Sequence, residues 1–265
     1  MATLVTFHAH PDDEAMTTGG VIAKYATEGH RVVIVFATGG EQGEAPEDLA
    51  PGESLAERRR REAEASAAVL GAHRVAWLGY QDSGMTGWEQ NRHPGAFTNA
   101  GVDEAATRLA AILTEERADT LTVYDWHGNY GHPDHVKVHA VGHRAAELAG
   151  TPHVYEATVN RDHLRRLVEA ATAAGLADDD FDVDGPADDG NPMGTPEDEI
   201  TTTVDVRAYT PRKRASIACH VSQVTDTAFF LGMSEEAFTE TFGQEWFIRA
   251  GAPPGTAEED LAGMG

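Results

Sequence analysis

Short apolar segments alternate with amphipathic segments along more than half of the chain, and this alternation is what most constrains the fold. Residues 31–38, RVVIVFAT, form a continuous apolar run that is typical of a strand buried on both faces. Similar strands are expected at residues 3–9, 74–80, 119–125 and 153–159, and helices at 14–29, 54–71, 102–117 and 135–150. Strands that alternate with helices predict an α/β fold, Rossmann-like, with a mostly parallel sheet between two layers of helices.

The regular alternation of strands and helices is not continued in residues 176–265. Residues 176–199 are acidic and rich in Gly and Pro, which favours a loop or insertion with a solvated surface over a cation site. Residues 200–206 alternate like an edge strand, and residues 211–224 are expected to be helical. The predicted organisation is a catalytic domain of residues 1–175, the acidic loop of 176–199, a C-terminal extension of 200–249 that completes the domain, and a disordered tail of 250–265.

Charge and cysteine content limit the partners of the protein. The formal net charge is −24, from 44 acidic and 20 basic residues, and this disfavours nucleic acid and anionic membranes, which need basic patches. Cys219 is the single cysteine, so no intrachain disulfide can form. No apolar run approaches the roughly 20 residues of a membrane span, and no signal peptide is recognisable. We expect a cytoplasmic protein that binds a small molecule; a homo-oligomer remains open.

Polar clusters follow four of the predicted strands. HPDDE comes after the first strand, TGGEQG after the second, YQDSGM after the third and DWHGNYGHPDH after the fourth. In open α/β sheets, ligands bind outside the carboxyl ends of the strands. Because parallel strands end at one edge of the sheet, the four clusters are predicted to converge on one site.

The histidines and carboxylates of these clusters predict a metal site. His10 and Asp13 are three residues apart, close enough to reach one cation, and His135 would join them from the far loop. Two histidines and one carboxylate with open positions form a catalytic zinc arrangement. The same donors bind Fe(II), so a non-haem iron oxygenase is an alternative. Asp12 points away from its neighbour and can serve as a general base, although either aspartate could simply cap a helix.

Three further histidines have ordinary structural interpretations. His139 and His143 continue the four-residue spacing that begins at His135, which places the three on one helix face. No glutamate lies where an H-E-x-x-H motif needs it, so we interpret His139 and His143 as packing or supporting residues. His8 lies on the first strand and is expected to pack in the core or to support the site.

The motifs as a set resemble a known family. HAHPDDE, TGGEQG, Arg59-x-x-Glu62, LGYQDSGM, YGHPDH, KRASIACHVSQ and GQEWF follow the order seen in the LmbE-like, or PIG-L, metal-dependent de-N-acetylases. The resemblance extends from residue 3 to about residue 249. It implies hydrolysis of an N-acetyl group on a glucosamine-containing small molecule, such as N-acetylglucosaminyl-inositol. It also implies zinc, with Fe²⁺ as a possible substitute, bound by His10, Asp13 and His135.

The same resemblance implies roles for the remaining motif residues. Asp12 matches the general base. His132 matches the residue that stabilises the tetrahedral oxyanion as a cation and protonates the leaving amine, with Asp134 orienting it. Tyr130 matches a residue that polarises the carbonyl. All of these residue types are intact, which favours an active enzyme over a binding module that has lost catalysis.

Four residues are expected to contact the substrate. Arg59 and Asp82 match family positions that contact the sugar, although by spacing alone one is part of an arginine run and the other a turn residue. Glu41 adds a hydrogen-bonding group suited to hydroxyl-rich ligands, and Trp88 either stacks on a sugar face or anchors its loop. Because these loops contain few aromatic residues, a short acetyl group on a polar sugar fits better than a long acyl chain.

The branch of the family stays open at this point. Mycothiol S-conjugate amidases resemble this chain but carry Lys where it has Thr17, and a small hydroxyl residue favours the deacetylase branch. Deacetylases that tailor antibiotics are a further alternative.

Overall fold

The computed structural model describes residues 1–173 and 182–264, which form one mixed sheet with helices on both faces. The order of the strands in the sheet is β3-β2-β1-β4-β5-β7-β6. The first five strands are parallel, and β7 pairs antiparallel with both β5 and β6. The bounds of the strands are β1 Thr3–His8, β2 Arg31–Thr38, β3 Arg74–Tyr80, β4 Thr120–Tyr124, β5 His153–Thr158, β6 Thr202–Asp205 and β7 Gln244–Arg249. The predicted α/β class is confirmed.

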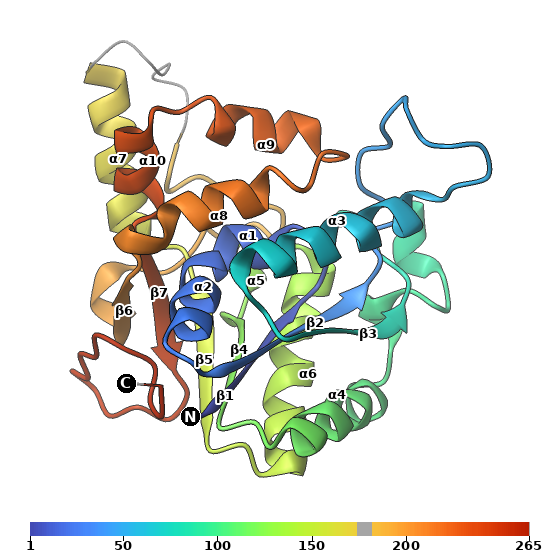
Figure 1. The fold of residues 1–265 in the computed structure, drawn as a ribbon, viewed down its shortest axis with the longest axis horizontal. Helices are drawn as coiled ribbons and strands as arrows, with labels where there is room; N and C mark the ends of the chain where they lie inside the picture. The colour runs from blue at the N-terminus through green and yellow to red at the C-terminus, as the bar shows by residue number, and fades with distance from the viewer. Residues whose placement is uncertain (174–181, 265) are drawn as a thin grey trace.

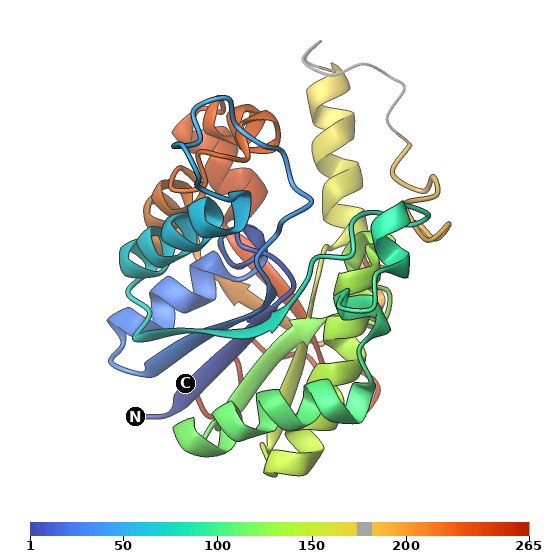
Figure 2. The same cartoon turned by 90° about the vertical axis from the view of Figure 1, so that its right-hand side faces the viewer.

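Helices cover the sheet in two layers (Figures 1 and 2). One layer contains α4 and α6, and the other contains α2, α3 and α8. Val33 and Val35 of β2 lie in the core under the first layer, and Val32 and Ile34 lie in the core under the second. The strand is therefore buried on both faces. The bounds of the helices are α1 Asp13–Thr17, α2 Gly19–Thr27, α3 Leu55–Leu70, α4 Val102–Glu116, α5 Gly128–Gly131, α6 Pro133–Ala149, α7 Arg161–Ala173, α8 Thr210–Ile217, α9 Val224–Leu231 and α10 Glu235–Phe242.

The order of the strands creates a switch point between β1 and β4. The chain winds outward from β1 to β2 and β3, then returns to place β4 and β5 on the other side of β1. The loops that follow β1 and β4 consequently diverge at neighbouring strand ends, which is where doubly wound sheets bind ligands. HPDDE spans the end of the first loop and the start of α1, and GHPDH spans the junction of α5 and α6 after β4.

Helix α6 lies unusually close to the sheet. A Cβ atom added at Gly142 would lie 2.2 Å from the Cγ1 atom of Val123 on β4, nearer than real contacts allow. Glycine at this position lets the helix approach the strand. The helix thus holds its N-terminal turn, with Asp134 and His135, against the end of β4.

Two predicted helices differ from those observed. The helix expected at 14–29 is interrupted at Thr18, whose φ of −131° is not helical and whose hydroxyl lies 3.1 Å from Nε2 of His8. The helix expected at 211–224 ends at Ile217. Beyond that end, His220 and Ser222 instead form hydrogen bonds with the buried carboxylates of Glu14 and Glu62. Long-range hydrogen bonds therefore override the local helical patterns.

The prediction of a disordered tail at residues 250–265 is wrong for the described residues 250–264. Leu261 and Met264 are buried in the core against α2 and β5. The backbone N–H groups of Leu261 and Ala262 donate to the hydroxyls of Tyr25 and Tyr155, respectively. Residues 250–264 are consequently part of the folded structure. Within the acidic loop, the described part begins at residue 182, and residues 176–181 lie outside the described residues.

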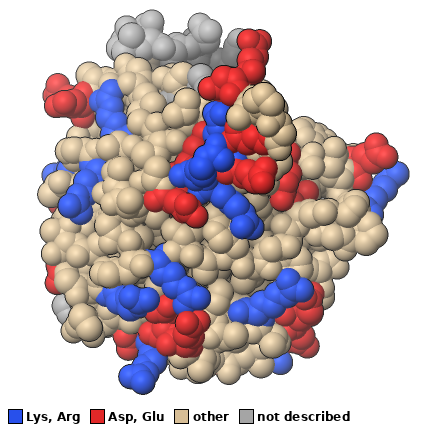
Figure 3. Space-filling view, turned by 45° about the vertical axis from the view of Figure 1, so that its right-hand side comes forward, with Lys and Arg blue, Asp and Glu red and all other residues tan. Residues whose placement is uncertain are grey.

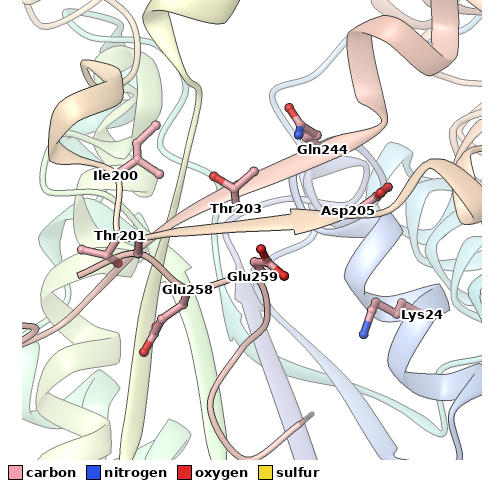
Figure 4. A pocket seen from close by; sticks show the side chains of 9 residues that line it. Lys24, Ile200, Thr201, Thr203, Asp205, Gln244, Glu258 and Glu259 are labelled. Atoms are coloured by element: carbon pink, nitrogen blue, oxygen red, sulfur yellow. The ribbon is translucent and has the colours of Figure 1, made fainter. Parts of the chain in front are cut away.

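The surface shows mixed charge and one cavity at the edge of the sheet. In Figure 3, basic side chains lie beside acidic ones on the face drawn. No helix within the described part of the chain has the length and apolar character to cross a bilayer. A cavity of about 590 Å³ beside β6 (Figure 4) has none of the candidate site residues in its wall. Its lining comprises Lys24, Ile200, Thr201, Thr203, Asp205, Gln244, Ala257, Glu258 and Glu259.

Candidate active site

The carboxylate of Asp13 links the two predicted histidine ligands. Asp13 follows β1 and opens α1, and its Oδ2 atom accepts a hydrogen bond of 2.8 Å from the backbone N–H of His10. The same oxygen lies 3.4 Å from Nδ1 of His10 and 3.3 Å from Nε2 of His135 on α6. The structure therefore brings together, at the switch point, the three residues predicted as metal ligands.

His135 is buried and its ring nitrogens are unpartnered. It is 1% exposed, and neither ring nitrogen has a hydrogen-bond partner. The ring of Tyr124 stacks on it, with 4.5 Å between the ring centroids. Buried polar groups in native proteins are nearly always hydrogen-bonded, so an unpartnered imidazole beside a carboxylate is a position that could bind a metal ion.

The second nitrogen of His10 faces two other carboxylates. Nε2 of His10 lies 3.2 Å from Oδ2 of Asp134 and 3.5 Å from Oδ1 of Asp82. Burial acts to lower the pKa of His10, but Asp82, Asp13 and Asp134 outweigh it and raise the pKa well above its usual value. The three carboxylates therefore favour a positive charge at the position of His10. A carboxylate behind a histidine also fixes the tautomer of a metal ligand.

Other combinations of donors also lie close together. Potential ligand atoms of His10, His132 and His135 lie within 4.8 Å of one another, as do those of His10, Asp82 and Asp134. The nitrogen and oxygen donors fit a divalent transition metal ion. The sequence predicted a catalytic role for His132 and not a role as a metal ligand. Replacing His132 therefore distinguishes these two roles.

Asp12 does not cap the helix that follows it. It precedes α1 with a φ of 104°, and its side chain makes no capping hydrogen bond. Instead its Oδ2 atom accepts a hydrogen bond of 2.9 Å from Arg59. Burial raises the pKa of Asp12 to about 6, partly offset by Arg59 and reinforced by Asp13. A strained backbone at a non-glycine residue of this kind is common at functional sites.

Arg59 lies beneath this loop. It is 3% exposed and donates to the carbonyl oxygens of Gly40 and Pro11 as well as to Asp12. Its position on α3 holds the loops after β1 and β2 together, which explains why this one arginine of the run 58–61 is buried. The sugar contact expected of Arg59 stays a prediction.

His132 and Asp134 interact differently from the expectation. Nδ1 of His132 accepts a hydrogen bond of 3.1 Å from the backbone N–H of Asp134, whereas the Asp134 carboxylate accepts from Ser83 and His10. Asp134 thus orients His132 through its backbone. Burial, followed by His10 and His135, lowers the pKa of His132 to about 2. Because Nδ1 accepts, the neutral form of the ring carries its proton on Nε2. The cationic role expected of His132 stays a prediction.

The other predicted residues surround this centre. The ring of Tyr130 lies 4.9 Å from that of His135, and burial raises the pKa of Tyr130 well above its usual value. Asp82 accepts hydrogen bonds from the backbone of Gln42 and Gly84, and Glu41 accepts from the backbone N–H of Asp82. These contacts join the loops after β2 and β3. Trp88 is 46% exposed.

Sequence reasoning missed several supporting residues. Ser83 is fully buried and holds the Asp134 carboxylate through both its backbone N–H and its hydroxyl. Glu14 accepts a hydrogen bond of 2.9 Å from the backbone N–H of Asp12, and its other oxygen lies 2.7 Å from Nε2 of His220. Ser83 belongs to the DSGM part of a motif that the sequence analysis did identify. His220 lies 206 residues from Glu14, so no local pattern could indicate their contact.

A doubly wound sheet with a His/Asp cluster and a separate carboxylate at its switch point is the arrangement expected of a hydrolase that could bind a metal. Residues 5–146 match the family described as GlcNAc-PI de-N-acetylase, PIG-L. The chain belongs to this family and is a hydrolytic de-N-acetylase, which confirms the resemblance seen in its motifs.

Named relatives and solved structures agree with this assignment. The chain is 38% identical to a 1D-myo-inositol 2-acetamido-2-deoxy-alpha-D-glucopyranoside deacetylase of Thermomonospora curvata, over 96% of this chain and 92% of the relative. A protein of the same description from Thermobifida fusca is also 38% identical, with 94% and 93% covered. The fold is similar to that of N,N'-diacetylchitobiose deacetylase from Pyrococcus horikoshii, with a TM-score of 0.59, 24% identity, and 96% and 84% covered.

Proposed function

We propose that the protein hydrolyses the N-acetyl group of 1D-myo-inositol 2-acetamido-2-deoxy-α-D-glucopyranoside, with Zn²⁺ as the metal and Fe²⁺ as the alternative ion. The observation that carries this proposal is the unpartnered His135 beside Asp13 and His10, with Asp12 free of any capping role. The substrate is inferred from the names of relatives that match nearly the whole chain.

In the proposed reaction, Asp12 accepts the proton of the attacking water. His10, Asp13 and His135 would hold a divalent ion, which would supply Lewis acidity toward the amide carbonyl and the attacking water. A raised pKa of about 6 suits Asp12 to take a proton near neutral pH and to return it to the leaving amine. The Nε2–H of neutral His132 donates to the developing oxyanion, because its Nδ1 is already an acceptor.

Space for a polar sugar exists beside Asp82. A cavity of about 470 Å³ has Asp82 in its wall, and all of its lining residues except Pro94 have polar side chains. Cavities of this size accommodate small ligands, and amide, carboxylate and guanidinium groups suit a hydroxyl-rich one. The lining residues are Gln42, Gln81, Asp82, Glu89, Gln90, Arg92, His93 and Pro94.

We expect the proposed inositol glycoside to be deacetylated with a higher kcat/KM than free N-acetylglucosamine, because the second ring adds contacts in this cavity. Release of primary amine, measured with fluorescamine for both compounds, tests this. Equal kcat/KM values would show that the inositol ring is not recognised. A preference for a mycothiol S-conjugate or for a long-chain N-acyl glycopeptide would instead place the protein in one of those branches.

The ligand assignment predicts that His135→Ala loses the active-site metal, whereas His132→Ala keeps it. Removing one of three protein ligands weakens binding strongly, whereas His132 is proposed to act on the substrate. Metal remaining at this site after dialysis, measured by mass spectrometry against the unaltered protein, provides the comparison. Retention by His135→Ala would remove His135 from the ligand set, and loss by His132→Ala would make His132 a ligand.

A further inference from the structure

A second group of potential metal ligands lies outside the candidate active site. His139 and His143 are on α6, one and two turns beyond His135, and Glu156 is on the neighbouring strand β5. Potential ligand atoms of His139, His143 and Glu156 lie within 4.8 Å of one another. The two imidazole rings are 4.5 Å apart between centroids, and Nε2 of His143 lies 2.9 Å from Oε1 of Glu156.

A hydrogen bond to the backbone orients the ring of His139. Its Nδ1 atom lies 3.0 Å from the carbonyl oxygen of Tyr124 and 4.0 Å from Oε1 of Glu156. Because a carbonyl can only accept, Nδ1 carries the proton, and the lone pair of the neutral ring is on Nε2. Metal-binding histidines commonly donate their other N–H to a backbone carbonyl in this way. His139 therefore has the supporting hydrogen bond of a ligand.

The group is accessible from solvent. The side chains of His139, His143 and Glu156 are 26%, 31% and 15% exposed, respectively. A cation can reach them directly, and water can fill the remaining coordination positions. Two imidazoles and one carboxylate suit Zn²⁺ and similar ions, whereas Mg²⁺ and Ca²⁺ prefer sites made of oxygen alone. Histidines one helical turn apart are a known arrangement for binding zinc.

We propose that His139, His143 and Glu156 form a second, exchangeable site for a divalent transition metal ion. The site joins α6 to β5 and is independent of the proposed reaction. It also adjoins the candidate active site, because His139 holds the carbonyl of Tyr124, whose ring stacks on His135. Occupation of the second site stabilises this wall of the active site.

Titration of the protein, loaded with its active-site metal, with ZnCl₂ in a calorimeter tests the proposal. We expect one further equivalent of Zn²⁺ to bind and to raise the Tm. His143→Ala and the near-isosteric Glu156→Gln should both lose this binding event and the shift in Tm, while keeping the deacetylase activity measured without added zinc. His153→Ala, on the same strand as Glu156, is the matched control and should retain both.

The two metal sites can also be separated by stoichiometry. Under equilibrium dialysis against free Zn²⁺, the unaltered protein should bind two ions, His143→Ala one and His135→Ala one. The double variant His135→Ala/His143→Ala should bind none. A second equivalent that persists in both His143→Ala and Glu156→Gln, or a total of one in the unaltered protein, would overturn the second site. A failed deacetylase assay alone would bear only on the proposed function.

Discussion

Asp12→Asn is expected to lower kcat by about 10²–10⁴-fold while the metal content stays unchanged. Asn cannot accept the proton of the attacking water, but it preserves the size of the side chain and can still accept from Arg59, which lies 2.9 Å from Oδ2. Asp12 makes no capping hydrogen bond, so little stability should be lost through the helix. Steady-state amine release, with metal content measured on the same samples, provides the test.

The matched control for this prediction is Asp48→Asn. Asp48 also pairs with an arginine, Arg58, but its side chain is 75% exposed and is not among the candidate metal ligands. Its replacement should leave kcat near the native value. If Asp12→Asn retained native turnover with full metal content, Asp12 would lose the role of general base.

The part of the fold that sequence alone predicted correctly is the part with strong local patterns. The run 31–38 is buried on both faces because consecutive residues point into different cores. By contrast, β7 was recognised only as part of a motif. Its antiparallel pairing with β5 and β6 joins residues far apart in the chain, and a short alternating segment does not specify that pairing.

The C-terminal segment likewise depends on contacts with residues far away in the sequence. Residues 250–264 contain few apolar side chains among glycine, proline and acidic residues, which is typical of a disordered tail. Leu261 and Met264 are nevertheless buried, and the hydroxyls of Tyr25 and Tyr155 accept from the backbone beside them. Those tyrosines lie more than a hundred residues earlier, so the segment folds because of partners that its own sequence does not indicate.

In the candidate site, sequence predicted which residues converge but not how they are connected. The spacing of His10 and Asp13 indicated a shared cation, and the structure places them together with His135. Their roles as ligands stay predictions. The burial of Arg59 and the hydrogen bond from the backbone of Asp134 to His132 depend on tertiary packing. A run of four arginines gives no sign of which member turns inward.

A buried ion pair connects β7 to α8. Lys213 on α8 donates to Oε1 of Glu245 on β7 at 2.7 Å, and both side chains are 2% exposed. The same carboxylate accepts from the backbone N–H groups of Gly20 and Val21 at 2.7 and 2.8 Å. These amides belong to the first turn of α2, where no helical carbonyl can serve them. Glu245 thus connects a strand and two helices.

Glu245→Ala is therefore expected to reduce the free energy of unfolding by about 3–5 kcal/mol, because it leaves a buried ammonium and two buried amides without their acceptor. Lys213→Met should cost less, since Glu245 keeps both amides at the positive end of α2. Urea unfolding followed by circular dichroism measures both. Glu197→Ala removes an exposed partner of Arg166 and should change stability by less than about 1 kcal/mol. Equal losses for Glu245→Ala and Lys213→Met would show that the ion pair, rather than the helix amides, accounts for the stabilisation.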